Sequence, residues 1–213
     1  AGMQNRGGTL KARQNQKLLM GPWTHKINSF SHAGDLDFGM DSLIDLRSLE
    51  LRWMDKWLKG EKNHIDKEPS VKWFVMGLNE WKDSEHWPLT AVEYTSYYLH
   101  SHGKAENLDT EGQLSRELPR NGLFDSFIYD PSSPVPTNGG CTCCNPEILS
   151  YGAFDQISIE KRQDVLTYTT PPLKQDTEVT GSIQVEIYAS SSAVDTDFTA
   201  KLVDVATADY AIN

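Results

Sequence analysis

The sequence Lys17-Leu-Leu-Met-Gly-Pro-Trp-Thr-His25 predicts a short buried strand that ends abruptly and is followed by a histidine. Three apolar residues form the strand, and Gly21-Pro22 ends it, because proline has no N–H to donate and glycine permits a sharp turn. Trp23 and His25 then follow the carboxyl end of the strand, where the reactive groups of open α/β sheets collect. A single histidine is more often a hydrogen-bonded structural residue than a proton carrier, so its role depends on the rest of the chain.

The segments that flank this stretch predict no second catalytic group. Residues 1–16 are polar and basic and predict a helix that leads into the strand. Residues 26–39 are rich in Ser, Gly and Asp and predict a loop. Within that loop, Asp35, Asp37 and His32 are interpreted as solvated residues rather than as partners of His25.

An amphipathic helix is predicted over residues 41–60. Apolar side chains recur at intervals of three or four residues, whereas charged side chains fill the opposite face. Asp41 is expected to cap the first turn, and Gly60 is expected to end the helix in the left-handed conformation. The apolar stripe is interpreted as core that covers the sheet, and it comprises Leu43, Leu46, Leu49, Trp53 and Trp57.

From Val71 onward the chain predicts β-structure. The apolar runs become short, β-branched and aromatic, and turn residues separate them, as in a sandwich or jelly roll. Residues 130–137 contain three prolines and are predicted to form an extended connector rather than a central strand. The predicted strands span residues 71–76, 94–99, 124–129, 165–169, 178–189 and 197–205.

Two clusters contain residue types that bind metals. His100 and His102 share one face of a predicted strand, but with no third ligand near in sequence they are interpreted as surface histidines. Cys141, Cys143 and Cys144 lack the fourth ligand and the spacing of a zinc site. They predict either one disulfide with a free thiol or three free thiols, and no metal or other cofactor is predicted.

The overall composition is that of a globular protein. The 213 residues carry a formal net charge of −10, which argues against nucleic acid and anionic membrane surfaces as partners. Hydrophobic residues make up 38% of the chain and aromatic residues 10%, enough for a packed core. No run approaches the roughly 18 apolar residues that a membrane span requires.

Five motifs carry a resemblance to one known group of hydrolases. They are GPWTH (21–25), WMDKWLKG (53–60), EPSVKWFVMGLNEW (68–81), YDPSSPVPTNGG (129–140) and ASSSAVDTDFTAKLVDV (189–205). In content and order they resemble the second half of the cocaine esterase and glutaryl cephalosporin acylase type of hydrolase, a relative of the X-Pro dipeptidyl-peptidases.

The resemblance implies a fold and a set of site residues. In that family an α/β-hydrolase domain precedes a β jelly-roll domain, so residues 1–62 are expected to end the first and residues 63–213 to form an incomplete jelly roll. His25 is implied as the general base of a Ser-His-Asp triad. Trp23 is expected to pack beside the site, and Gly139, Gly140 and Cys141 to line the pocket for a small acyl ester, amide or peptide substrate.

The triad is expected to be incomplete within these residues. No Gly-x-Ser-x-Gly occurs, so there is no nucleophile elbow, and the family's triad Asp lies before the histidine. The chain is therefore expected to be a fragment, inactive alone, that associates with a missing N-terminal catalytic portion or with itself. The alternative function is a non-catalytic β-sandwich module that binds carbohydrate or a partner chain.

Overall fold

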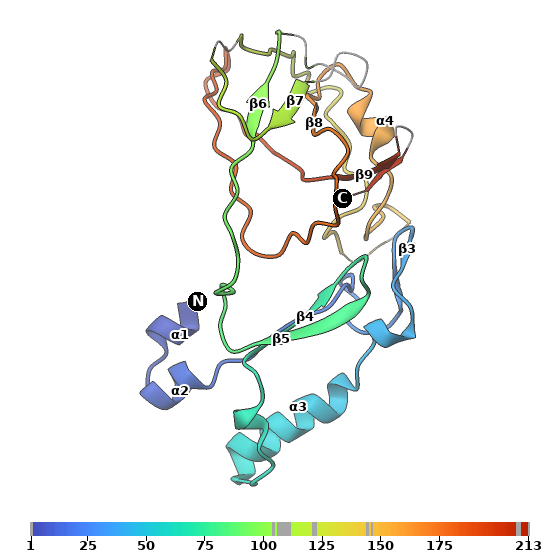
Figure 1. Cartoon of the computed structure of the whole chain (residues 1–213). Helices are drawn as coiled ribbons and strands as arrows, with labels where there is room; N and C mark the ends of the chain where they lie inside the picture. The colour runs from blue at the N-terminus through green and yellow to red at the C-terminus, as the bar shows by residue number, and fades with distance from the viewer. Residues whose placement is uncertain are drawn as a thin grey trace. The chain divides into compact units, whose positions relative to one another are not determined.

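The computed structural model describes residues 2–103, 105, 112–120, 123–143, 145, 147–207 and 210–212. The chain divides into two compact units (Figure 1). Unit 1 comprises residues 1–92 and 141–144, and unit 2 comprises residues 93–140 and 145–213. Among the described residues, no helix combines the length and the apolar character that crossing a bilayer requires.

A three-stranded sheet forms the centre of unit 1, in the order β1 (Leu18–Met20), β4 (Val71–Val75), β5 (Glu80–Ser84). The predicted strand before Gly21 is therefore present, and it pairs in parallel with β4, with Leu18 opposite Val71. β4 and β5 form an antiparallel hairpin whose turn contains Asn79 in the left-handed conformation, at φ 55°. The predicted boundary between residues 62 and 63 stays a prediction, since β4 follows it in the sequence yet pairs with β1 before it.

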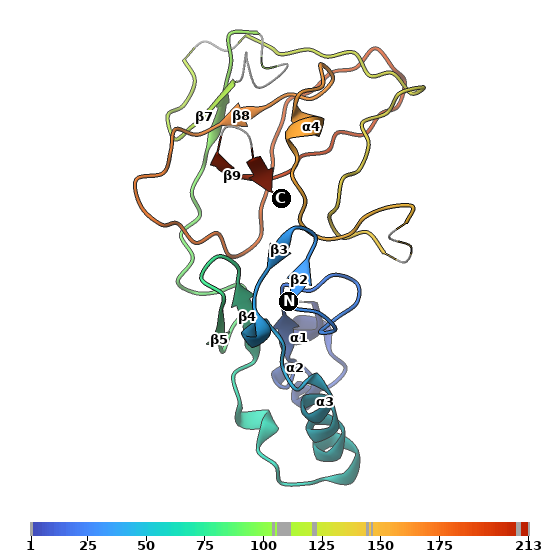
Figure 2. The same ribbon diagram turned by 90° about the vertical axis from the view of Figure 1, so that its right-hand side faces the viewer.

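Side chains of β4 point alternately to two small cores, as expected for a strand buried on both faces. Val71, Trp73 and Val75 form one core, against which Leu18 and Met20 of β1 pack. Phe74 packs on the other face with Ala33 and Phe38. Ala33 belongs to the hairpin of β2 (His32–Ala33) and β3 (Leu36–Asp37), which is labelled in Figure 2.

The helices of unit 1 are short, apart from one. They are α1 (Gly2–Arg6), α2 (Leu10–Gln14), η1 (Met40–Ser42), α3 (Leu46–Met54), η2 (Asp55–Lys59), which continues α3 as a π-helix, and η3 (Ile65–Lys67). The expected cap at Asp41 is wrong: Asp41 lies in η1, and Asp45 caps α3 by accepting a hydrogen bond from the backbone N–H of Ser48 at 3.0 Å. Gly60 ends the helix in the left-handed conformation, at φ 77°, as predicted. The apolar stripe is half-buried along α3 rather than fully enclosed.

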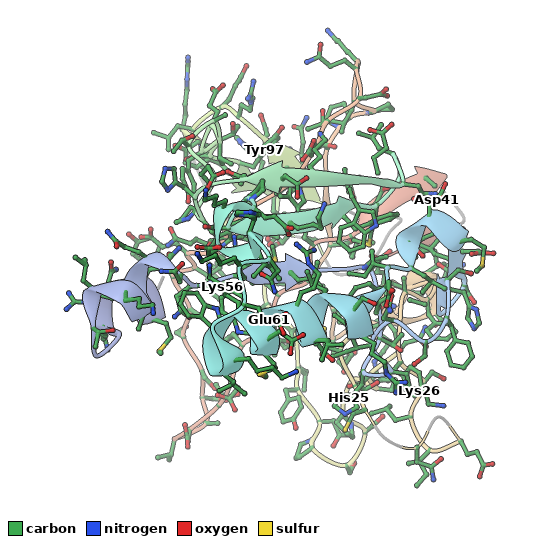
Figure 3. All side chains as sticks on the ribbon, turned by 90° about the horizontal axis from the view of Figure 1, so that it is seen from below. His25, Lys26, Asp41, Lys56, Glu61 and Tyr97 are labelled. Carbon is green, nitrogen blue, oxygen red and sulfur yellow. The ribbon has the colours of Figure 1, made fainter. Side chains whose placement is uncertain are left out.

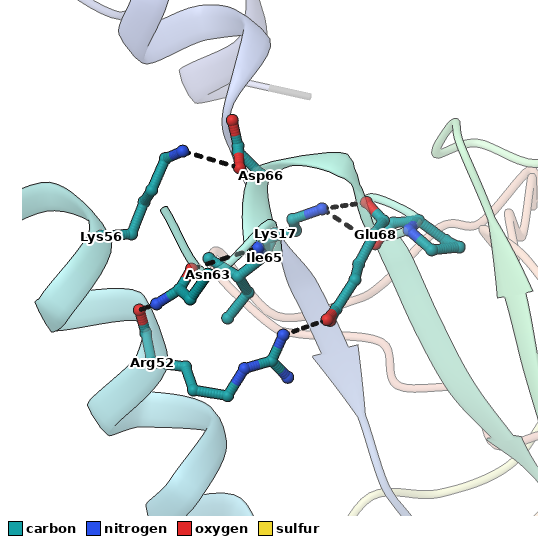
Figure 4. A network of polar contacts seen from close by, with 8 residues as sticks. Lys17, Arg52, Lys56, Asn63, Ile65, Asp66 and Glu68 are labelled. Atoms are coloured by element: carbon teal, nitrogen blue, oxygen red, sulfur yellow. Dashed lines mark hydrogen bonds and ion pairs between the residues drawn. The ribbon is translucent and has the colours of Figure 1, made fainter. Parts of the chain in front are cut away.

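A network of polar contacts ties the helix α3–η2 to the segment before β4 (Figure 4). Arg52 pairs with Glu68, and Lys56 Nζ lies 2.9 Å from Asp66 Oδ1. Lys17, immediately before β1, donates to the backbone carbonyl of Glu68. Burial lowers the pKa of the Lys17 ammonium, against the raising effect of the nearby carboxylates. These contacts hold α3 and the start of β1 to the same segment.

The described residues of unit 2 form a second three-stranded sheet, two further short strands and one helical turn. The sheet has the order β6 (Tyr98–His100), β7 (Gly112–Ser115), β8 (Tyr168–Thr169), and β9 (Asp204–Thr207) pairs with β10 (Tyr210–Ile212). The helical turn is α4 (Ile157–Glu160). Residues 124–129 and 178–189, which were predicted as strands, carry no strand, and the described residues close no barrel.

Candidate active site

The loop after β1 is shaped by Gly21 and Trp23. A Cβ on Gly21 would lie 2.6 Å from three atoms of the Trp23 indole, so only glycine lets the ring fold back over the strand end. The indole Nε1 donates to the carbonyl of Ser42 at 3.1 Å, and Ser42 is fully buried. The ring also packs against Trp81, with centroids 5.7 Å apart. Trp23 is therefore a fixed part of the loop and lies two residues before His25.

His25 is exposed on this loop. No hydrogen bond joins its imidazole to another residue in the described part of the chain, so both ring nitrogens are accessible to a partner. Figure 3 shows His25 and Lys26 toward the start of α3, whereas Lys56 and Glu61 mark its other end. A general base must lie within hydrogen-bond reach of the group whose proton it takes, and the exposed imidazole of His25 is open to such a group.

The loop returns to the body of unit 1 at Asn28. The Asn28 side-chain Nδ2 donates to the carbonyl of Ile44 at 2.7 Å, and the backbone N–H of Ile44 donates to Asn28 Oδ1 at 2.9 Å. Asn28 adopts the left-handed conformation, at φ 54°, which asparagine tolerates better than most residues. Both ends of the loop are thus attached to the short segment that precedes α3.

An open, largely apolar cavity of about 490 Å³ lies beside the loop. Its walls come from the end of β1, from the loop itself and from the first turns of α3. The lining residues are Leu19, Met20, Gly21, Trp23, Ile27, Leu46 and Glu50. Trp23 is one of these lining residues, and its expected place beside a substrate site stays a prediction.

The other predicted pocket residues are held in a tight backbone arrangement. Gly139 and Gly140 are both left-handed, at φ 75° and 82°, and Gly140 exchanges two backbone hydrogen bonds with Gly152, of 2.7 and 3.0 Å. A Cβ on Gly139 would lie 2.4 Å from the Gly152 carbonyl oxygen. Both glycines belong to unit 2 and Trp23 belongs to unit 1, so their joint role in one pocket stays a prediction.

The cysteines follow one of the two predicted alternatives where the structure describes them. Cys141 has a free, exposed thiol, and Cys143 is disulfide-bonded. Cys144 lies outside the described residues. No hydrogen bond links Cys141 with His25, both of which are described.

Asp37, in the segment that follows the His25 loop, stabilises a local turn. Asp37 Oδ1 accepts a hydrogen bond from the Gly39 backbone N–H at 3.0 Å, which, with the Ser31 hydroxyl, lowers the pKa of Asp37. His32 lies in β2 rather than in a loop. The described residues contain no group of three or more His, Cys, Asp and Glu side chains arranged to hold a metal ion.

Sequence reasoning missed Asn28, Ser42 and Trp81 as supports of the His25 loop. Trp81 Nε1 donates to the carbonyl of Asp41 at 2.9 Å, next to the carbonyl that Trp23 uses. The left-handed tendency of asparagine could have indicated a turn at Asn28. The hydrogen-bond partner of Asn28, Ile44, lies 16 positions further along the chain. Such a partner is not visible in local patterns.

Three curated relatives are esterases or peptidases by name. Cocaine esterase of Rhodococcus sp. is 38% identical over 199 residues, which cover 92% of this chain and 34% of that protein. A candidate serine esterase of Mycobacterium bovis is 28% identical over 203 residues, covering 88% of this chain and 28% of the relative. A candidate Xaa-Pro dipeptidyl-peptidase of Bacillus anthracis is 26% identical over 167 residues, which cover 78% of this chain and 24% of that protein. The chain spans about a third or less of the length of these relatives.

A family match covers most of the chain after α3. Residues 63–209 match the X-Pro dipeptidyl-peptidase C-terminal non-catalytic domain. The matched segment includes Gly139, Gly140 and Cys141, whereas Trp23 and His25 lie before it. Since the match covers more than half of the 213 residues, the chain belongs to the X-Pro dipeptidyl-peptidase C-terminal domain family.

Proposed function

We propose that this chain is part of a serine hydrolase that cleaves ester or amide bonds, and that His25 is its general base. The observation that carries the proposal is an exposed histidine on a loop that is anchored at both ends beyond the carboxyl end of a parallel strand. The esterase and dipeptidyl-peptidase names of the relatives support the reaction class.

In the proposed mechanism His25 takes the proton of a serine hydroxyl and returns it to the leaving group. Since no Gly-x-Ser-x-Gly occurs in the 213 residues, the nucleophile, the oxyanion donors and the triad Asp belong to other parts of the full-length protein. The chain alone is then inactive, because a base without a nucleophile has no proton to take.

The same proposal includes a domain arrangement and a substrate pocket. Residues 1–62 form the end of an α/β-hydrolase domain, and residues 63–213 form a jelly roll that other parts of the protein complete. Trp23, Gly139, Gly140 and Cys141 line the pocket for a small acyl compound or an X-Pro dipeptide. β4 lies after residue 62 yet pairs with β1 before it, so the support for this boundary comes from the family match over residues 63–209.

The test is the His25→Ala substitution in the full-length protein. A positioned base contributes roughly 10²–10⁴-fold, so kcat for p-nitrophenyl ester hydrolysis should fall by about that factor, and labelling by a fluorophosphonate should slow as much. The thermal midpoint should not change, because His25 is exposed. His32→Ala, an exposed histidine in β2, is the matched control and should keep full activity. Retention of a tenth of the activity by His25→Ala would exclude His25 as the base.

A second candidate function follows from the family description. Residues 63–209 match a domain described as non-catalytic, which favours a binding or interaction role for this part of the chain. Specific glycan-array binding that survives His25→Ala would support that role, whereas fluorophosphonate labelling alone would support only the hydrolase.

A further inference from the structure

We propose that Asn28 is a positioning residue for His25, whose side-chain amide fixes the loop that carries the imidazole. The inference rests on the proposed function of His25 as a base. Asn28 lies three residues after His25 and is half-buried against Ile44, with both polar groups of its amide used in hydrogen bonds.

The amide of Asn28 binds Ile44 as a neighbouring strand would. It donates to the Ile44 carbonyl and accepts from the Ile44 N–H, at 2.7 and 2.9 Å, which is the reciprocal pattern of an antiparallel residue pair. The reversed amide orientation would place two donors and two acceptors face to face, so the hydrogen bonds themselves determine the orientation. Alanine or glycine at this position would lose both hydrogen bonds.

A second anchor lies on the other side of the histidine. Trp23 donates to the carbonyl of Ser42, two residues before the partner of Asn28. His25 therefore sits in a span of four residues, 24–27, between two attachments to one short segment. A span this short with both ends attached has few conformations, whereas a span attached at one end has many.

The consequence for catalysis is a restriction of the imidazole to a small volume. Misplacement of a catalytic group by about 1 Å can cost roughly 10²-fold in rate. Asn28→Gly in the full-length protein should therefore lower kcat by about 10- to 100-fold, with KM within about twofold of the unchanged protein. Glycine accepts the left-handed backbone of residue 28, so the substitution removes the hydrogen bonds without adding strain.

The matched control is Asn79→Gly. Asn79 has the same residue type and nearly the same φ, 55°, but lies in the turn between β4 and β5. Its described contacts include a backbone hydrogen bond to Val75 and no side-chain hydrogen bond. It should keep the kcat of the unchanged protein.

A double-mutant cycle separates positioning from a general structural role. If Asn28 acts through His25, then Asn28→Gly should not change the residual rate of His25→Ala, since groups that act as a unit are not additive. A further loss in the His25→Ala background, or a kcat for Asn28→Gly equal to that of Asn79→Gly, would overturn the inference. If His25→Ala itself keeps a tenth of the activity, the proposed function fails, and the inference fails with it.

A second variant covers the case in which Asn28→Gly does not fold. Trp23→Phe keeps an aromatic ring but removes the N–H that holds the other end of the loop. It should also lower kcat, and it should also have no effect in the His25→Ala background. A loss that persists in that background would count against positioning of His25 by the two anchors.

Discussion

Asp125 is the most heavily hydrogen-bonded carboxylate in the described part of unit 2. Its Oδ1 accepts from the Ser101 hydroxyl and from the Ala105 backbone N–H, and its Oδ2 accepts from the Tyr168 hydroxyl at 2.6 Å. Burial alone would raise the pKa of Asp125, but these hydrogen bonds outweigh it and lower the pKa. Burial, with the hydrogen bond to Asp125, raises the pKa of Tyr168. These hydrogen bonds join Ser101, Ala105 and Asp125 to Tyr168 of β8.

The stability of unit 2 should depend on pH at both extremes because of this pair. Because the pKa of Tyr168 is raised in the folded state, the tyrosine of the unfolded chain loses its hydroxyl proton at a lower pH, near the ordinary value of about 10. Above that pH the free energy of unfolding therefore falls as pH rises. The lowered pKa of Asp125 stabilises the fold above about pH 4, and this contribution is lost as pH falls through the folded-state pKa.

Tyr168→Phe is the sharp test. At pH 7 it should cost about 1–2 kcal/mol, because Asp125 loses a donor, and the fall in stability above about pH 10 should become shallower. Urea unfolding at neutral and alkaline pH measures both effects. Tyr129→Phe, at an exposed tyrosine, is the control, and an alkaline fall in Tyr168→Phe as steep as in the unchanged protein would contradict the assignment.

Residues that act locally could be predicted, and residues that act through distant partners could not. Gly21-Pro22 indicated where the strand stops and where the His25 loop begins, because both residues act on their own backbone. Asn28 carried only the signal of a turn and Ser42 none, since their roles exist only when the chain brings residues 28 and 44, and 23 and 42, together. The pocket role of Gly139 could be suggested only from the family resemblance.

The helix α3–η2 shows the same difference at the level of elements. Gly60 was predicted because a glycine after an amphipathic run is a common end signal. The start was misplaced by four residues, from Asp45 to Asp41, because both positions hold an aspartate able to cap a helix and residues 40–42 form a separate 3₁₀ turn. β5 was missed because Glu80–Ser84 is mostly polar and lies at the edge of its sheet.

Gly60→Ala should destabilise unit 1 by about 1–2 kcal/mol. A Cβ meets nothing within 4 Å there, so the cost comes from the left-handed backbone, φ 77°, and not from a clash. Gly8→Ala is the control, because that glycine is also open but has no positive φ, and it should be neutral or slightly stabilising. Thermal unfolding of the two variants compares them directly, and equal midpoints would contradict the left-handed C-terminus.

Predicted strands that failed to form lie mostly in unit 2. Residues 124–129 and 178–189 have β-type sequences, but their large apolar side chains are exposed in the structure. A strand is stabilised by cross-strand neighbours and by a face to bury, and neither is provided for these segments. A sequence pattern describes the tendency of a segment to form a strand, but the strand forms only where a neighbouring strand pairs with it.

The chain by itself should self-associate. Phe124, Ile128 and Tyr188 expose 85%, 87% and 97% of their surface, and large exposed apolar side chains favour association. Light scattering after size exclusion should give masses above 24.0 kDa that grow with concentration. Replacing Phe124 and Ile128 by serine should reduce the association, whereas Leu58→Ser, at an exposed leucine of unit 1, should not. A monomeric mass at every concentration would contradict this expectation.

The pairing of β1 with β4 affects the order in which the protein is made and assembled. Leu18 and its partner Val71 are 53 positions apart (71 − 18), and a parallel contact over such a separation forms slowly. During translation, β1 and the segment with His25 leave the ribosome well before β4 does. The nascent chain therefore carries an unpaired, apolar β1 just before the His25 loop for several seconds, at roughly 5–20 residues per second. In that interval the exposed strand is a natural target for a chaperone, whereas the partners that anchor the His25 loop, Ser42 and Ile44, emerge before β4.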